Sequence, residues 1–149
     1  MKFQSQKSSC GPAALSAALE AIGIERTESE LSTLCGSTAD GTDHNQMLSA
    51  LATVRKSESA VIGRGFQDKA DVALLRLLRA IDDGHSVVVC VSTVDPWDHY
   101  ACVVGRLGNR IIAFDPGSAE SMNSMTVDEF MSWWRGPKGE RKPFYGILV

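Results

Sequence analysis

The sequence predicts an α+β fold in which N-terminal helices pack on a C-terminal antiparallel sheet. Helical periodicity and helix-capping patterns dominate residues 1–84, whereas β-branched runs separated by short turns dominate the remainder. Helices that come first and strands that follow together are typical of an α+β layout. The length of 149 residues suits one domain, which we expect to span residues 1–149.

Local patterns set the expected helices. The first covers 12–22, because proline is tolerated in a first helical turn and Gly23 is a natural stop. A strongly amphipathic helix covers 68–83. Three other helices begin at spacings in which two side chains cap the helix start. These pairs are Thr27 with Glu30, Asp43 with Gln46, and Thr126 with Glu129.

The expected strands cover 59–63, 86–92, 99–106, 110–115 and 144–149. The dipeptide Gly108-Asn109 favours a hairpin turn between the third and fourth of them. Residues 99 and 115 then fall near the open end of that hairpin, staggered by about one residue. We expect charged or turn-rich loops over 93–98 and 136–143. Trp133 and Trp134 lie on the last helix, where core or edge packing is the first interpretation and an exposed partner surface the alternative.

Composition and charge exclude several classes of protein. A net charge of −3 offers no phosphate-binding surface, so we expect no nucleic-acid partner. The polar N-terminus is unlike a signal peptide, and the longest apolar run, Val87 to Val91, is too short to cross a membrane. These features predict a cytoplasmic protein without membrane insertion. Its four cysteines are then expected as free thiols, and their spacing does not suggest a metal site.

Cys10 is the candidate nucleophile. It stands at or just before the first helix, where unpaired N–H groups and the helix dipole stabilise a thiolate. The alternative is that Cys10 is one small buried hydrophobe among the four cysteines. We expect Cys90 and Cys102 in the core and Cys35 at a partly buried helix end, with a role for Cys35 as a resolving thiol as the alternative.

A cysteine nucleophile needs a base, and the base needs a group that orients it. His99 and Asp115, at the open end of the hairpin, suit these two roles and complete a Cys–His–Asp triad with Cys10. His44 and His85 are expected at the surface, and a Cys10–His44 dyad is the alternative assignment. Asp98 adds a second carboxylate beside His99, which would raise its pKa or compete for its ring.

Several motifs together resemble those of a known family. Gln4 precedes Cys10-Gly11-Pro12-Ala13 by five residues, and Gly41-Thr42 leads into a helix. His99 opens an apolar strand that reaches Gly105, and another apolar strand ends in Asp115-Pro116. These motifs resemble the papain-like cysteine peptidases that remove double-glycine leaders from bacteriocins and usually form the N-terminal domain of an ABC exporter. The resemblance spans Gln4 to about Pro116, whereas the chain itself contains no transporter segments.

This resemblance implies a papain-like fold and a role for each motif residue. Cys10 would attack the scissile carbonyl, His99 would act as general base and then acid, and Asp115 would orient His99. Gln4 would donate its side-chain amide to the oxyanion together with the Cys10 backbone N–H. Gln6 is a rival donor, but its offset from Cys10 does not fit the family. Gln4 also requires that the chain terminus be held in place.

The sequence therefore predicts a cysteine peptidase. The resemblance further implies that it cuts after small residues, such as Gly-Gly or Gly-Ala, in a peptide whose leader lies in a surface groove. Its partners would be a peptide or protein substrate and a separate exporter, and the chemistry needs no cofactor. Two alternatives remain open. The same triad could transfer acyl or amide groups or deamidate a substrate, as in transglutaminase-like or effector-type enzymes. A non-catalytic leader-binding module is the other, although Cys10, Gln4, His99 and Asp115 together argue against it.

Overall fold

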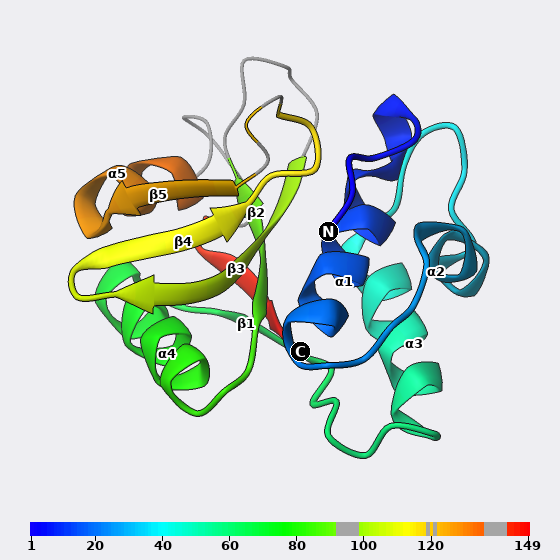
Figure 1. Cartoon of the computed structure of the whole chain (residues 1–149), viewed down its shortest axis with the longest axis horizontal. Helices are drawn as coiled ribbons and strands as arrows, with labels where there is room; N and C mark the ends of the chain where they lie inside the picture. The colour runs from blue at the N-terminus through cyan, green and yellow to red at the C-terminus, as the bar shows by residue number, and fades with distance from the viewer. Residues whose placement is uncertain (92–98, 119, 121, 136–142) are drawn as a thin grey trace.

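In a computed structural model, which describes residues 1–91, 99–118, 120, 122–135 and 143–149, the α+β prediction is confirmed. The strands within these residues form an antiparallel sheet with the order β1-β6-β2-β3-β4-β5 (Figure 1). The strands are β1 (Arg64–Gln67), β2 (Val87–Val91), β3 (His99–Leu107), β4 (Arg110–Phe114), β5 (Met122–Thr126) and β6 (Tyr145–Leu148). The loop predicted over 93–98 and most of the one over 136–143 lie outside the described residues.

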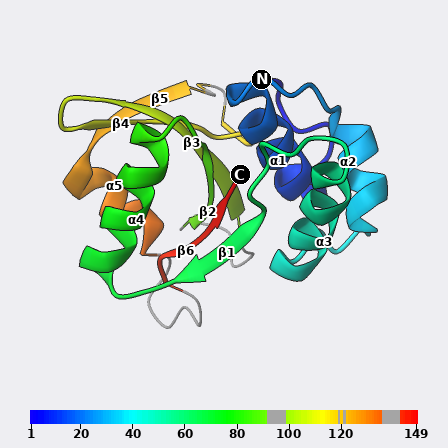
Figure 2. The same ribbon diagram turned by 90° about the horizontal axis from the view of Figure 1, so that it is seen from below.

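Helices cover both faces of this sheet. They are α1 (Cys10–Ala21), α2 (Glu28–Cys35), α3 (His44–Arg55), α4 (Ala70–Asp82) and α5 (Val127–Trp134). Figures 1 and 2 show α1, α2 and α3 on one side of the sheet and α4 and α5 on the other. Two apolar clusters follow from this arrangement, one on each face. In the described part of the chain, no helix has the length and apolar character needed to cross a membrane.

Helix starts match the sequence patterns closely. All three predicted capping boxes form, with Thr27, Asp43 and Thr126 as the N-cap residues of α2, α3 and α5. Helix α1 starts at Cys10, two residues before the predicted start, because a short 3₁₀ turn (Lys7–Ser9) leads directly into it. Most of α1 is buried, since its alanines and leucines face both the sheet and the neighbouring helices. Cys10 is thereby carried on a rigid central helix.

One predicted strand is misplaced, and one strand of the structure was not predicted. The segment 59–63 contains no strand, and β1 instead follows it at Arg64–Gln67. The edge strand β5 was missed, because Met122–Thr126 is a mostly polar segment without a run of β-branched residues. It pairs with β4 over its whole length.

The β3–β4 hairpin forms at the predicted turn, but its register shifts. Gly105 pairs with Ile112 and Val103 with Ala113, so Val104 is an extra residue on β3. If the pairing continued one step beyond Cys102 and Phe114, Asp115 would lie opposite Ala101, which is two residues from His99. The predicted stagger between Asp115 and His99 was about one residue. Without the bulge the turn would set them three residues apart. Because residues two apart point to the same face of a strand, the bulge gives these two side chains a common side.

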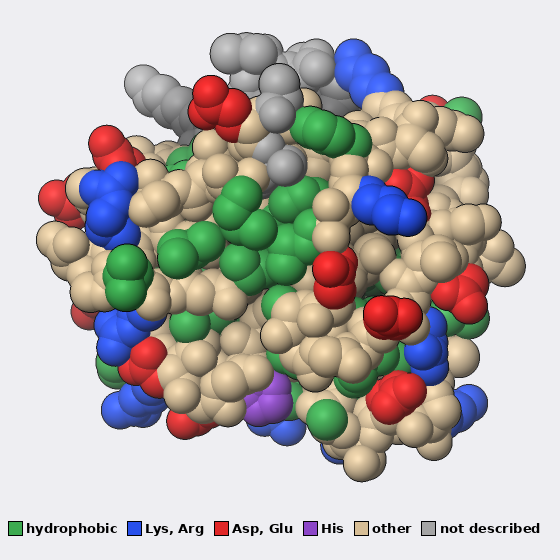
Figure 3. Space-filling model, viewed as in Figure 1, with side chains coloured by type: hydrophobic (Ala, Val, Ile, Leu, Met, Phe, Trp, Pro, Cys, Tyr) green, Lys and Arg blue, Asp and Glu red, His purple; other side chains and the backbone are tan. Residues whose placement is uncertain are grey.

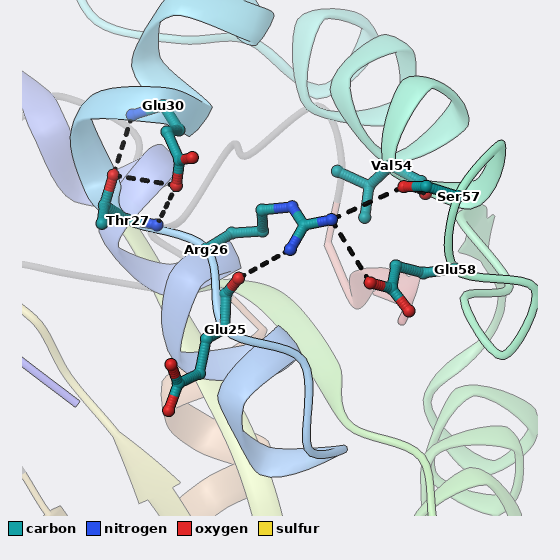
Figure 4. A network of polar contacts seen from close by, with 7 residues as sticks. All are labelled: Glu25, Arg26, Thr27, Glu30, Val54, Ser57 and Glu58. Carbon is teal, nitrogen blue, oxygen red and sulfur yellow. Dashed lines mark hydrogen bonds and ion pairs between the residues drawn. The ribbon is translucent and has the colours of Figure 1, made fainter.

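Arg26 joins three helices at the corner between α1 and α2 (Figure 4). Its guanidinium donates to the Glu25 carbonyl at 2.7 Å and pairs with the Glu58 carboxylate at 3.3 Å, just after α3. The Arg26 carbonyl in turn accepts the Ser16 hydroxyl of α1 at 2.7 Å. The start of α2 is therefore fixed against both neighbouring helices.

The two adjacent tryptophans differ in environment. Trp134 is fully buried between α5 and the sheet, and its Nε1–H donates to the Tyr145 carbonyl at 2.8 Å. Trp133 is half-buried and meets Phe130 edge-on. The first interpretation, core and edge packing, therefore describes them.

We expect Trp134→Phe to lower the free energy of unfolding by about 1–3 kcal/mol, because it leaves the buried Tyr145 carbonyl short of a donor. Trp133→Phe is the matched control and should cost less than about 1 kcal/mol, since Trp133 makes no comparable bond in the described residues. Urea denaturation of both variants measures the difference. Equal losses would contradict the role assigned to the Trp134 hydrogen bond.

Candidate active site

Cys10 stands at the first residue of α1, half-buried, at the edge of a cleft. The next residue, Gly11, is packed so closely that an added Cβ would lie 3.2 Å from both the Thr42 Cβ and the Met47 Sδ. The loop before α3 therefore lies directly against the start of α1. This close approach makes the loop one wall of the cleft beside the Cys10 thiol.

His99 and Asp115 form the opposite wall. The His99 Nε2 lies 2.6 Å from Asp115 Oδ1, and both side chains are largely buried. The same carboxylate oxygen accepts the Gly117 N–H at 2.9 Å, while the Ser118 N–H bonds to the Asp115 carbonyl. The segment Asp-Pro-Gly thus folds into a turn whose own backbone orients the Asp115 carboxylate toward the ring.

The His99 ring links Asp115 to Cys10. Because Nε2 is bonded to Asp115, Nδ1 is the ring nitrogen left to face the thiol. Burial lowers the pKa of His99, but hydrogen bonds with Asp115 and Cys10, and their charges, outweigh it and raise the pKa to about 9. The ordinary value is 6.5, so the ring holds a proton at neutral pH.

Asp115 is shifted in the complementary direction. Burial raises the pKa of its carboxyl, but the hydrogen bonds from His99 and from the Gly117 N–H outweigh burial and hold the pKa below its usual value. The carboxylate therefore keeps its charge next to the protonated ring. The arrangement is a chain of thiol, imidazole and carboxylate that can move one proton without losing its orientation.

Gln4 reaches the same cleft from the N-terminal segment, which is held in place. Its backbone N–H donates to the Pro116 carbonyl at 3.0 Å, so the segment is tied to the turn that carries Asp115. Its side-chain Nε2 donates to the carbonyls of Gln6 and Lys7, at 2.9 and 3.1 Å. The Gln4 Oε1 is buried, and it has no hydrogen-bond partner among the residues that the structure describes. The rival donor Gln6 is exposed.

The cleft that these residues share has a volume of about 1050 Å³. Apart from the residues already described, it is lined mainly by the loop Thr38–Asp43. Apolar side chains gather beside it in the middle of the face seen in Figure 3, where β3 and β4 run past α1. Half-buried Val104 and Ile112 and exposed Met122 belong to these strands and to β5. An extended or helical peptide could thus contact both polar and apolar surface.

His44 was expected at the surface, and this expectation is wrong. It is only 6% exposed, its Nδ1 lies 2.6 Å from the Tyr100 hydroxyl, and its ring stacks on Tyr145 at 3.8 Å. The histidine that contacts Cys10 is His99, whereas His44 ties α3 to β3 and β6 beneath the cleft. Sequence reasoning missed this cluster because its three members are far apart in the chain. His85 is half-buried and its Nδ1 lies 3.1 Å from the Val149 carbonyl.

Cys90 and Cys102 take their expected places in the core, where they are buried on strands. Cys35 lies at the end of α2 as expected, but it is buried rather than partly buried. Burial, followed by the charge of Asp43, raises the pKa of Cys35 to about 11, so this thiol stays protonated at neutral pH. Asp98 lies outside the described residues. Among those that are described, no three His, Cys, Asp or Glu side chains group as ligands for a metal ion.

Gly117 provides a direct test of this geometry. A Cβ there would lie 3.0 Å from His99 Cε1 and 3.4 Å from both His99 Nε2 and Gln4 Oε1. We expect Gly117→Ala to displace the ring and to slow alkylation of Cys10 by iodoacetamide at pH 7 about tenfold. Gly105→Ala is the matched control, because nothing lies within 4 Å of its added Cβ. Similar alkylation rates in the two variants would contradict the described contact.

Two curated proteins with similar sequences are described as transport/processing ATP-binding proteins. The chain is 28% identical over 130 residues to the lactococcin transport/processing ATP-binding protein LcnC-like of Lactococcus lactis subsp. lactis. It is 26% identical over 127 residues to the lactococcin-A transport/processing ATP-binding protein LcnC of the same subspecies. Each match covers 85% of this chain but only 16% of the relative. The chain thus spans about one sixth of the length of these relatives.

Solved structures share the fold. The peptidase domain of Streptococcus ComA, a bifunctional ABC transporter of a quorum-sensing pathway, superposes with a TM-score of 0.73 at 22% identity, covering 99% of this chain and 96% of that domain. A double glycine motif protease from an AMS/PCAT transporter, solved with a leader peptide, gives 0.65 at 16% identity, covering 99% and 86%. These likenesses show that the chain shares the fold of these peptidase domains, in agreement with the predicted packing of helices on an antiparallel sheet. The family model that matches residues 1–140 is decisive: the chain belongs to the Peptidase_C39 like family.

Proposed function

We propose that this chain, acting as one domain over residues 1–149, is a cysteine peptidase that uses Cys10, His99 and Asp115. The observation that carries the proposal is the continuous contact from the Cys10 thiol through the His99 ring to the Asp115 carboxylate. Membership of a peptidase family supports hydrolysis of a peptide bond as the reaction. No step in the reaction below requires a cofactor.

The reaction follows from the proton that His99 holds. With that proton on the ring, Cys10 attacks the scissile carbonyl as a thiolate, forming a C–S bond and an oxyanion. His99 then gives the proton to the leaving amine as the C–N bond breaks, which leaves an acyl-enzyme. Water, deprotonated by the now neutral His99, attacks the thioester and releases Cys10. Asp115 stays ionised throughout and keeps the ring oriented.

Gln4 is proposed to stabilise the oxyanion together with the Cys10 backbone N–H. Its side chain lines the cleft with Cys10 and His99, which supports this role. Both of its amide hydrogens point at the carbonyls of Gln6 and Lys7, so donation to the oxyanion would share or replace one of these bonds. Removing one oxyanion donor typically costs a factor of about 10²–10³ in kcat.

The proposed substrate is a peptide with a double-glycine-type leader, cut after its small residues. The solved double glycine motif protease binds a leader peptide, and the lactococcin relatives combine transport with processing. By analogy, the product would pass to a separate exporter from the cytoplasmic side. The apolar surface beside the cleft is a suitable place for the leader.

Two other functions could use the same cleft. Acyl or amide transfer shares the acyl-enzyme and differs only in the group that resolves it. A leader-binding module would need the cleft but not the thiol. The bonded His99–Asp115 pair favours the enzymes over the module, because recognition alone does not require a strongly raised pKa at His99.

Incubation with double-glycine leader peptides, followed by mass spectrometry, tests the proposal. We expect the wild type to release the leader and Cys10→Ala to bind the peptide without cleaving it. Cys35→Ala is the matched control, because its buried thiol lies away from the cleft lining, and it should retain cleavage. Peptide binding by the wild type without cleavage, together with ordinary thiol reactivity at neutral pH, would contradict the proposal that the chain is a peptidase.

The pH dependence of kcat/KM follows from His99. Its pKa is raised, so the protonated ring is present below about pH 9 and is lost as the pH rises through that value. We expect an alkaline limb near pH 9 in the wild type. In Asp115→Asn the limb should move to lower pH, because the carboxylate that raises the His99 pKa is gone. An unchanged limb in this variant would argue that another group titrates there.

A further inference from the structure

We propose that Glu28 is a positioning residue that holds Gln4 in the active-site cleft; this inference rests on the proposed function. The Glu28 carboxylate accepts the Ser5 backbone N–H at 3.0 Å and also accepts the Ser5 hydroxyl. Ser5 is the residue directly after Gln4, whereas Glu28 lies 23 residues away along the chain. The contact therefore ties the N-terminal segment to α2 immediately beside the proposed oxyanion donor.

The second anchor of this segment lies on the other side of Gln4. The Gln4 N–H donates to the Pro116 carbonyl, next to Asp115. The segment is thus held to the His99–Asp115 wall by Gln4 and to α2 by Ser5. With both anchors in place the Gln4 backbone has one position relative to the cleft. Among the described residues, release of the Glu28 anchor would leave the segment held by the bonds of Gln4 itself and, three residues earlier, by the ion pair between the Met1 amino group and Glu20 at 2.6 Å. Neither of these contacts holds the chain on the Ser5 side of Gln4.

Glu28 projects from a rigid part of the molecule. It is the first residue of α2, whose start is closed by the Thr27–Glu30 capping box and fixed by the Arg26 network of Figure 4. A group that positions another residue needs such support, because a mobile group cannot hold its partner in one place. The Glu28 carboxylate is also a strong acceptor, because charged acceptors form shorter and stronger hydrogen bonds than neutral ones.

A merely structural role for Glu28 makes a different prediction. An acidic residue in the first turn of a helix stabilises it through the helix dipole, as Glu30 also does in this turn. Such an effect changes the stability of the fold and leaves the catalytic step untouched. The positioning role predicts that loss of Glu28 lowers kcat and that this loss disappears when Gln4 is absent. The structural role predicts neither effect.

The experiment combines Glu28→Ala with Gln4→Ala in a double-mutant cycle on leader-peptide cleavage. We expect Glu28→Ala to lower kcat about tenfold with KM and Cys10 alkylation unchanged. In the Gln4→Ala background the same change should cost less than about twofold, because Gln4 is no longer there to be positioned. A tenfold loss that persists in this background, or no loss in the wild type, would overturn the proposal.

Further variants separate position from folding. Glu28→Gln keeps an acceptor oxygen, so we expect it to retain kcat within about threefold of the wild type. Ser5→Ala removes only the hydroxyl donor, leaves α2 intact, and should lose less than Glu28→Ala. Glu25→Gln is the matched control on the exposed surface nearby and should be neutral. A Glu28→Gln variant as impaired as Glu28→Ala would refute the role of the acceptor.

The position of Gln4 can also be measured without any substrate. The side-chain ¹⁵N–¹H resonances of Gln4, identified by their loss in Gln4→Ala, should move to the averaged shifts of an exposed glutamine in Glu28→Ala. Unchanged resonances would overturn the inference whether or not the wild type cleaves peptide. Failure of the proposed function would instead appear as absence of cleavage by the wild type, with the resonance shift still present.

Discussion

The hydrogen bond between His99 Nε2 and Asp115 is the contact on which the rest of the site depends. It fixes the ring and leaves Nδ1 for the Cys10 thiol. Together with the contact to Cys10, it also reverses the effect that burial alone would have on the His99 pKa. Two local features of the hairpin create it. The bulge at Val104 brings the two residues to one side of the sheet, and the Asp-Pro-Gly turn aims the carboxylate through the Gly117 N–H. A small change in either feature would separate the pair.

The thiol reaches this pair because α1 is central. Its apolar surface packs on β3 and on the other N-terminal helices, so Cys10, as its first residue, has little freedom to move. The loop before α3 packs on Gly11 and completes the cleft. The site is therefore assembled where helices from the first half of the chain meet the end of the sheet from the second half. Its geometry relies on core packing rather than on the cleft residues alone.

Patterns confined to short segments predicted most of this fold. The three capping boxes, the hairpin turn and the buried strand Val87–Val91 each depend on neighbours in the chain, and all appear in the structure. What the sequence did not indicate depends on distant partners. The bulge at Val104, the polar edge strand β5 and the burial of His44 against Tyr100 leave no local signal. The bond from Ser5 to Glu28 is of the same kind, because neither residue is unusual in its own segment. The order of the motifs suggested the candidate residues, but the distances between these residues could be learned only from the fold.

The raised pKa of His99 bears on the order of events in the proposed reaction. A base with a pKa near 7 would suit a proton transfer that occurs during the attack itself. A ring with a pKa of about 9 already carries a proton at neutral pH, so in the proposed reaction it does not take one up during the attack. The step that remains for His99 in acylation is then proton donation to the leaving amine. A strongly held proton is donated less readily to the leaving amine. Stabilisation of the oxyanion must therefore account for more of the reduction in the activation barrier for acylation. On this argument the placement of Gln4 weighs more in this site than it would beside a weaker base.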